Sequence, residues 1–197
     1  KNKNWHVRTL CSLELNDIGT KHGFSLDFLV GIFNSKLLHY FVLNNSNTVR
    51  GGYLRYRPQY IKEFPLPKIS NSNLIDNIVV MVNLISSLTF SFMKKTGDFC
   101  NYLSLQFTIE NLSKKLQNWE ELEFVEFIKE LNKSIKKIGG EKLTKMDEMD
   151  WMDVFDTKKE EVQNLKFEID KVDKEIDQMV YDLYSLTEEE IKIVEES

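Results

Sequence analysis

The fold of this 197-residue chain is constrained most strongly by two segments in which apolar residues recur at intervals of three and then four positions. In the first segment the positions are Ile75, Ile78, Val82, Ile85, Thr89 and Phe92, of which all but Thr89 are apolar. In the second they are Val162, Leu165, Ile169, Val172, Ile176, Met179 and Leu183. This spacing places apolar side chains along one stripe of a helix, and the stripe must be buried against a partner. The sequence predicts two long helices that pack antiparallel within the chain, although the same spacing also suits pairing with another chain.

Shorter patterns complete a mainly α prediction, α+β overall, with a small mixed α/β end followed by a helical bundle. Alternation and β-forming residues predict strands over 7–15 and 53–57. Periodicity, caps and prolines predict helices over 26–43, 58–64, 73–95, 101–117, 119–138 and 147–184. The Gly139-Gly140 pair is expected to end the fifth of these helices. Thr187 and Glu190 have the spacing of a capping box at the start of a final helix.

Charge is divided between the two ends of the chain. Residues 1–70 hold ten Lys and Arg against four Asp and Glu, a net charge of +6. The remaining residues hold sixteen against twenty-seven, a net charge of −11. The sequence therefore predicts two domains, the C-terminal part of a basic recognition domain over 1–70 and an acidic helical scaffold over 71–197. The scaffold is expected to be a poor surface for DNA, because like charges repel.

The sequence carries no recognisable catalytic motif. Its glycines form no GxG loop for a nucleotide-type cofactor, and the Asn-Pro-Pro-Tyr quartet of amino-methyltransferases is absent. The three histidines are scattered, without partners at metal-binding spacing. Asp182, Glu190 and Lys192 superficially match a metal-dependent nuclease pattern, but Glu190 stands where a capping box would use it. We therefore expect no catalytic, cofactor-binding or metal-binding residue in this segment.

Features of secreted and membrane proteins are also missing from the sequence. No uninterrupted apolar run reaches the roughly 18–20 residues that span a bilayer, and residues 1–5 lead into no signal peptide. Cys11 and Cys100 form no CxxC pair, so we expect two small core residues in a reducing compartment. These observations predict a cytoplasmic protein with no membrane partner. Lys1 is not an initiator methionine, which predicts a piece of a longer protein.

A basic, tyrosine-rich stretch from Val49 to Lys62 is the one positive signal for binding. Three arginines and a lysine are interleaved there with three tyrosines, and no acid interrupts them. Glycines allow close approach of backbone to phosphate, guanidinium groups grip phosphate oxygens, and tyrosine hydroxyls add contacts. The candidate DNA-binding residues are Arg50, Gly51, Gly52, Tyr53, Arg55, Arg57, Tyr60 and Lys62. A solvated basic hairpin that only packs its tyrosines is an equally good interpretation of these residues alone.

Three stretches of the chain resemble the C-terminal region of restriction–modification enzymes. Ile32–Leu38 resembles a helix near the end of their target-recognition domains. Arg50–Pro67 resembles the segment that leads into their first long helix, and Glu168–Ile191 resembles their closing segment. Together, and in this order, the stretches resemble the TaqI-like C-terminal specificity domain of type IIG restriction endonuclease–methyltransferases. Ser185 stands where that family often has glycine.

The resemblance implies a DNA-specificity region that contributes to target-site binding and takes no part in catalysis. It implies a prokaryotic parent enzyme that is an adenine-specific DNA methyltransferase using S-adenosylmethionine, in some members fused to an endonuclease that needs a divalent metal. The implied partners are double-stranded DNA and the catalytic methyltransferase domain of the same polypeptide. Two alternatives remain: a helical module that assembles homo-oligomers, and part of a type I-like specificity subunit that docks methylase subunits.

Overall fold

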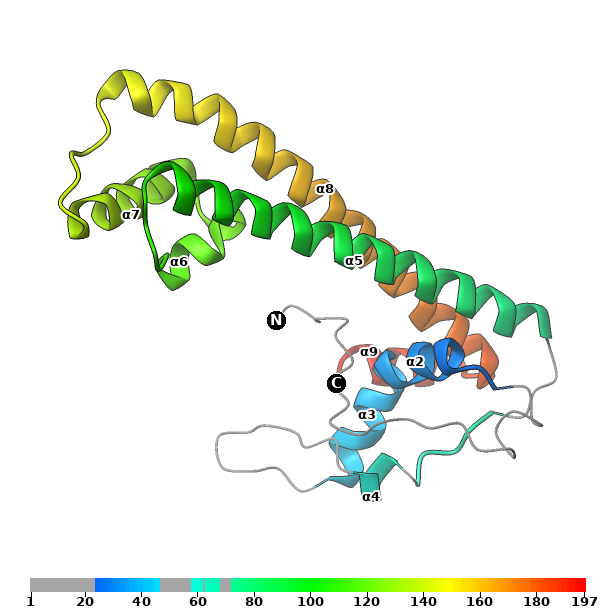
Figure 1. The fold of residues 1–197 in the computed structure, drawn as a ribbon. Helices are drawn as coiled ribbons and strands as arrows, with labels where there is room; N and C mark the ends of the chain where they lie inside the picture. The colour runs from blue at the N-terminus through cyan, green and yellow to red at the C-terminus, as the bar shows by residue number, and fades with distance from the viewer. Residues whose placement is uncertain (1–23, 47–57, 62, 68–71) are drawn as a thin grey trace. The chain divides into compact units, whose positions relative to one another are not determined.

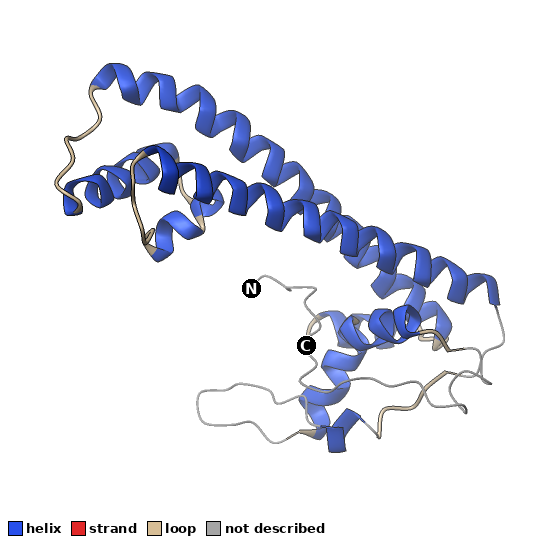
Figure 2. Cartoon of the chain, in the orientation of Figure 1, coloured by secondary structure: helices blue, strands red, loops and turns tan. Residues whose placement is uncertain are grey.

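A computed structural model describes residues 24–46, 58–61, 63–67 and 72–197, and every regular element in these ranges is a helix (Figures 1 and 2). The prediction of a mainly α chain is confirmed for this part of the chain. The strands predicted over 7–15 and 53–57 lie outside the described residues. The described elements are α2 (Leu26–Asn34), α3 (Lys36–Asn45), α4 (Pro58–Ile61), α5 (Ser72–Gln106), α6 (Lys114–Gln117), the 3-10 helix η1 (Trp119–Glu121), α7 (Phe124–Lys137), α8 (Lys145–Leu183) and α9 (Glu188–Glu195).

The chain forms two compact units. Unit 1 comprises residues 1–86 and 170–197, and unit 2 comprises residues 87–169. The two longest helices, α5 and α8, each contribute one part to unit 1 and the other part to unit 2. Unit 1 therefore includes residues on both sides of the domain boundary predicted at residue 70. A division into compact units does not test where one domain family ends, so that boundary stays a prediction.

The core of unit 1 is built where α5 and α8 lie side by side and antiparallel (Figure 1). The buried apolar residues that these two helices supply are Ile75, Ile78, Val82, Ile85, Val172, Ile176 and Val180. Gly31 lets α2 approach this seam closely, because a Cβ at that position would lie 2.8 Å from Ile78 Cγ2 and 3.0 Å from Val82 Cγ2. Most of the residues in the three–four pattern are thus buried inside one chain, as predicted for internal pairing.

Aromatic side chains dominate the core of unit 2. Phe99 of α5 packs against Trp119 in a tilted arrangement with ring centroids 4.3 Å apart, and Phe127 of α7 stacks on Phe155 of α8 at 4.7 Å. The Trp119 indole donates a hydrogen bond to the carbonyl oxygen of Thr96 at 3.3 Å, so its one polar group is satisfied. The short helices α6, η1 and α7 therefore cover the ends of α5 and α8 that belong to this unit.

Three predicted helix limits are wrong. The helix expected over 26–43 is broken at Ser35, where α2 and α3 meet with a bend of 62°. The separate helices expected over 73–95 and 101–117 are replaced by one helix, α5, which runs unbroken to Gln106. The helix expected over 119–138 begins only at Phe124, after the 3-10 turn. The predicted long helix over 147–184 is confirmed as α8.

Helix ends follow local capping rules. The backbones of α5, α7 and α8 end with a residue at positive φ, at Thr108 (54°), Gly139 (81°) and Ser185 (54°). Each end has the paired backbone bonds of a Schellman motif, for example Leu186 N–H to Tyr181 O at 3.0 Å. At the start of α9, Thr187 and Glu190 form the predicted capping box.

By length and composition, α5 could also cross a membrane, and the bent pair of α2 and α3 passes the same test together. Buried core helices of soluble proteins share these properties. In α5 the positions Ile75, Ile78, Val82 and Ile85 are buried in the protein core. Of the most apolar 18-residue window of α5, 22% is buried. The expected absence of a membrane partner stays a prediction.

Candidate nucleic-acid interface

Most of the predicted DNA-binding residues lie outside the described part of the chain. Arg50, Gly51, Gly52, Tyr53, Arg55, Arg57 and Lys62 are in this group. Tyr60 is described: it lies in α4 and its side chain is half-buried. The flanks of the basic stretch are also described, since α3 ends at Asn45 and α4 begins at Pro58. The structure therefore describes the residues on either side of the stretch.

Aromatic packing holds the two flanks together. Phe64, which follows α4, is 6% exposed and makes an edge contact with Phe41 of α3, with ring centroids 5.1 Å apart. On its other side Phe64 meets the ring of Tyr184 at the end of α8 at 5.7 Å. The Tyr184 hydroxyl donates a hydrogen bond to the carbonyl oxygen of Pro65 at 2.8 Å, and burial raises its pKa, which keeps the donor protonated. The segment after α4 is thus held against both α3 and the end of α8.

Residue Ser35 sets the direction of α3. Its backbone is extended (φ −67°, ψ 155°), and its hydroxyl accepts from Leu38 N–H at 3.3 Å as the N-cap of α3. The same hydroxyl donates to Ile32 O at 2.7 Å. Asp177 of α8 accepts the backbone N–H of Lys36 at 2.8 Å, and this carboxylate is only 2% exposed. Two free N–H groups at the start of α3 are thereby satisfied, and a negative charge lies at the end of the helix that favours it.

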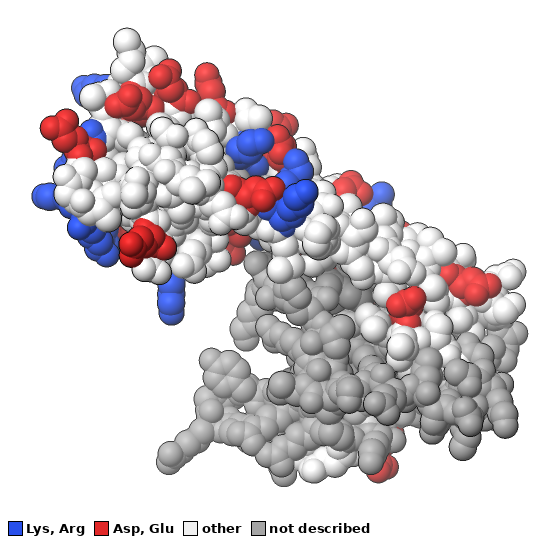
Figure 3. All heavy atoms as spheres, in the orientation of Figure 1, with Lys and Arg blue, Asp and Glu red and all other residues white. Residues whose placement is uncertain are grey.

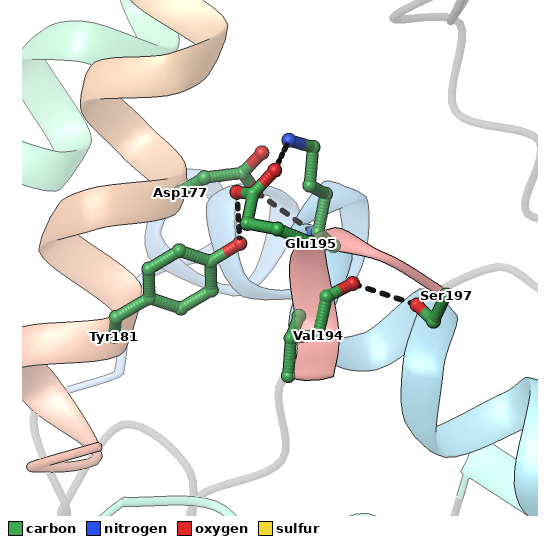
Figure 4. A network of polar contacts seen from close by, with 6 residues as sticks. Asp177, Tyr181, Val194, Glu195 and Ser197 are labelled. Carbon is green, nitrogen blue, oxygen red and sulfur yellow. Dashed lines mark hydrogen bonds and ion pairs between the residues drawn. The ribbon is translucent and has the colours of Figure 1, made fainter. Parts of the chain in front are cut away.

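A second set of polar contacts joins α9 to the same corner (Figure 4). The Glu195 carboxylate accepts from the Tyr181 hydroxyl at 2.7 Å through Oε1 and pairs with the Lys36 ammonium through Oε2. Burial and then the hydrogen bond to Glu195 raise the pKa of Tyr181, so its hydroxyl remains a donor at neutral pH. We call Lys36, Asp177, Tyr181 and Glu195 the clasp.

Sequence reasoning missed the clasp as a unit. Ser35 and Lys36 belong to one stretch of the family resemblance, and Asp177 and Tyr181 belong to another, so the resemblance contained most of its parts. The resemblance did not indicate that residues of the two stretches contact each other. One signal was available: Asp177 follows Ile176 on the apolar side of a long helix, where an acid needs a donor.

The remaining reactive side chains make structural contacts. Glu190 accepts from Thr187 N–H at 2.8 Å in the capping box, and Asp182 accepts from Gln178 Nε2 at 2.9 Å, as expected of ordinary helix residues. Burial, followed by the charge of Glu120, raises the pKa of the Cys100 thiol to about 11, which suits an inert core thiol. Among the described residues, no three His, Cys, Asp or Glu side chains gather as a metal site.

Unit 2 contains one open hollow of about 340 Å³ whose lining is mostly charged. Glu123 and Lys159 line it and pair with each other, with Lys159 Nζ 3.0 Å from Glu123 Oε1 and 2.8 Å from the carbonyl oxygen of Leu122. Burial raises the pKa of Glu120, which also lines it. Because acids and lysines mix across the hollow, its chemistry points to no particular ligand.

Comparison with known families gives two matches in sequence order. A family model described as the TaqI-like C-terminal specificity domain matches residues 6–66, which include α2, α3 and α4. A model described as a domain of unknown function (DUF8810) matches residues 71–180, from α5 into α8. No curated protein and no solved structure matches the chain. The first match confirms the family resemblance, and the clasp joins the two matched segments through Lys36 and Asp177.

Proposed function

Because the chain belongs to the DUF8810 family and carries a TaqI-like specificity match ahead of that domain, we propose that it is the DNA-specificity region of a restriction–modification protein. The observation that carries the proposal is the match over residues 6–66, since it contains the whole basic stretch. The stretch would contact DNA phosphates through Arg50, Arg55, Arg57 and Lys62, with Tyr53 and Tyr60 as helpers. Such contacts position a protein on DNA without reading its sequence.

The described geometry supports this role by its attachment of the basic stretch. Phe64 between Phe41 and Tyr184 holds one flank, and the clasp at Lys36 orients the helix that leads into the other. A binding segment held at both ends loses less conformational entropy when DNA binds than a free one does. The C-terminal helices then act as a scaffold for the recognition segment.

The burial of the apolar stripe favours DNA binding over the alternative of a helical assembly module. Val162, Val172 and Ile176, which would form the seam of an intermolecular coiled coil, are each at most 4% exposed within the single chain. The other positions of the same stripe, Leu165, Ile169, Met179 and Leu183, are half-buried, so the chain itself covers much of this seam. Homo-oligomers and docking to a methylase subunit are therefore not part of the proposal.

The proposal extends to the parent protein. Methyl transfer to adenine, with S-adenosylmethionine as donor, would take place in a catalytic methyltransferase domain of the same polypeptide. A divalent metal would be needed where the parent also cleaves DNA. We assign no residue of this chain to the binding of S-adenosylmethionine or of the metal. The reaction would take place in the cytoplasm.

A salt titration tests the proposal. The affinity of the chain for a labelled DNA duplex is measured over a range of salt concentrations for the wild type, Arg55→Ala and Arg57→Ala. Each lost phosphate contact should make the log–log slope shallower by about 0.9. Lys171→Ala, on the exposed side of α8, is the control and should keep the wild-type slope. Slopes that do not change in the two arginine variants would refute the assignment of this stretch.

A further inference from the structure

Helix α7 carries a stripe of lysines, although the C-terminal region as a whole has a negative net charge. Residues 129–145 hold six lysines against two glutamates, whereas the whole of residues 71–197 has a net charge of −11. Four of these lysines fall on one side of α7, because spacings of four, three and one bring them within about a third of a turn. We call Lys129, Lys133, Lys136 and Lys137 the α7 stripe, and all four are exposed.

The nearby acids compensate the stripe only in part. Glu126, on the same side of the helix, pairs with Lys115 of α6. Glu130 is 8% exposed and forms an ion pair with Lys133, whose Nζ lies 3.7 Å from Oε1 of the glutamate. Figure 3 shows Lys and Arg atoms at the end of unit 2 that contains α7, with Asp and Glu atoms among them. The acidic start of α8 lies to one flank, where Glu148 is 3.5 Å from Asn132 Nδ2.

We propose that the α7 stripe contacts the phosphate backbone of duplex DNA, which makes unit 2 a second, sequence-independent contact. This inference rests on the proposed function for its partner. From Lys129 to Lys136 the helix rises about 10 Å at 1.5 Å per residue. Over that length a duplex presents about six phosphate charges, enough for each ammonium group to find a partner.

The chemistry of the stripe favours phosphate over bases. Lysine is a flexible point charge without the planar fork that reads guanine edges, and the stripe contains no arginine and no aromatic residue. The proposal departs at α7 from the expectation that this acidic region is a poor surface for DNA. Lys136 and Lys137 also lie in the last turn of the helix, where they compensate the negative end of its dipole. That role needs no DNA, so the test must separate the two.

The test compares two charge-matched variants of the full chain. One replaces the stripe by Lys129→Gln, Lys133→Gln, Lys136→Gln and Lys137→Gln. The other removes the same charge from exposed lysines elsewhere by Lys94→Gln, Lys171→Gln, Lys174→Gln and Lys192→Gln. Affinity for a labelled duplex of random sequence is measured by fluorescence anisotropy against salt concentration, and thermal unfolding is measured in parallel.

We expect the stripe variant to lose about 2 to 4 in log–log slope, and the control less than 1. Equal slopes in the two variants would overturn the inference, whatever the melting temperature of the stripe variant. The lysines would then serve only to compensate the negative end of the α7 dipole. If Arg55→Ala still changes the slope in that case, the proposed function stands. A wild-type chain that binds no duplex would overturn both.

Discussion

The carboxylate of Asp177 accepts the backbone N–H of Lys36 at 2.8 Å, across 141 residues of sequence. The bond joins the start of α3, inside the TaqI-like match, to α8, inside the match to the domain of unknown function. The acceptor is buried and the donor residue is half-buried, so the bond cannot be replaced by water without a cost. Because α3 leads directly toward the basic stretch, this contact couples the helical scaffold to the proposed DNA-binding segment.

Removal of this acceptor should destabilise the protein. Asp177→Ala leaves the Lys36 N–H unsatisfied and removes a charge from the start of α3, at a cost of about 2–3 kcal/mol. Asp177→Asn retains an acceptor of similar shape and should cost about 1 kcal/mol. Urea unfolding measures both. A loss below about 0.5 kcal/mol for the alanine variant would contradict the structural role given to the clasp.

Among the residues that flank the basic stretch, Phe64 should contribute most to the stability of the chain. Phe64→Ala opens a cavity between Phe41 and Tyr184 and should cost about 3–5 kcal/mol. Leu66, two residues on and 44% exposed, provides a matched control, and Leu66→Ala should change stability by less than about 0.5 kcal/mol. Unfolding by denaturant measures these values. If the two variants lose equal stability, the packing account of this segment is wrong.

Periodicity and local rules were sufficient for much of the fold. The long stripes predicted α8 and the seam with α5, because burial of a stripe depends only on spacing. The capping box at Thr187 and the end of α7 at Gly139 depend on neighbouring residues, so the sequence contains all that they need. The basic stretch was recognisable from composition and from the family resemblance.

Long-range contacts explain what the sequence did not predict. The apolar pattern of residues 26–43 continues across Ser35, and the break there is held by Asp177, which lies far away in the sequence. Likewise α5 continues beyond Lys95 because Thr96 and Phe99 take part in the aromatic core around Trp119. Neither partner can be identified from the local sequence. For the same reason the clasp was not foreseen.

Two positions should gain stability from glycine. Thr108 and Ser185 have φ of 54°, a left-handed conformation that costs a residue with a side chain about 1–2 kcal/mol. Thr108→Gly and Ser185→Gly should each stabilise the chain by about 0.5–1 kcal/mol, once the larger unfolded-state entropy of glycine is subtracted. Gly139→Ala, at φ 81°, is the reverse control and should destabilise by about 1 kcal/mol. Calorimetric melting measures all three, and a destabilised Ser185→Gly would contradict the prediction.

Ionisation of Glu120 should lower the free energy of unfolding as the pH rises. Burial raises its pKa in the folded state above the ordinary value of 4.5, so the folded state binds the proton more tightly than the unfolded state. Its contribution is therefore fully present below pH 4.5 and is lost as the pH rises through the raised value. Glu120→Gln should raise the melting temperature at pH 7 and leave it unchanged at low pH. Glu160→Gln, at an exposed position of α8, removes the same charge and is the matched control.

Ultraviolet cross-linking of the full chain to duplex DNA, followed by mass mapping of the modified peptides, tests the central claim most directly. We predict adducts within residues 50–62, at Tyr53 or Tyr60, and we predict that Arg55→Ala and Arg57→Ala reduce their yield. A weaker set within residues 129–137 would accompany them if the α7 stripe also lies on DNA. Bound DNA without adducts in residues 50–62, or no bound DNA at all, would contradict the assignment of this chain as a DNA-specificity region that acts through its basic stretch.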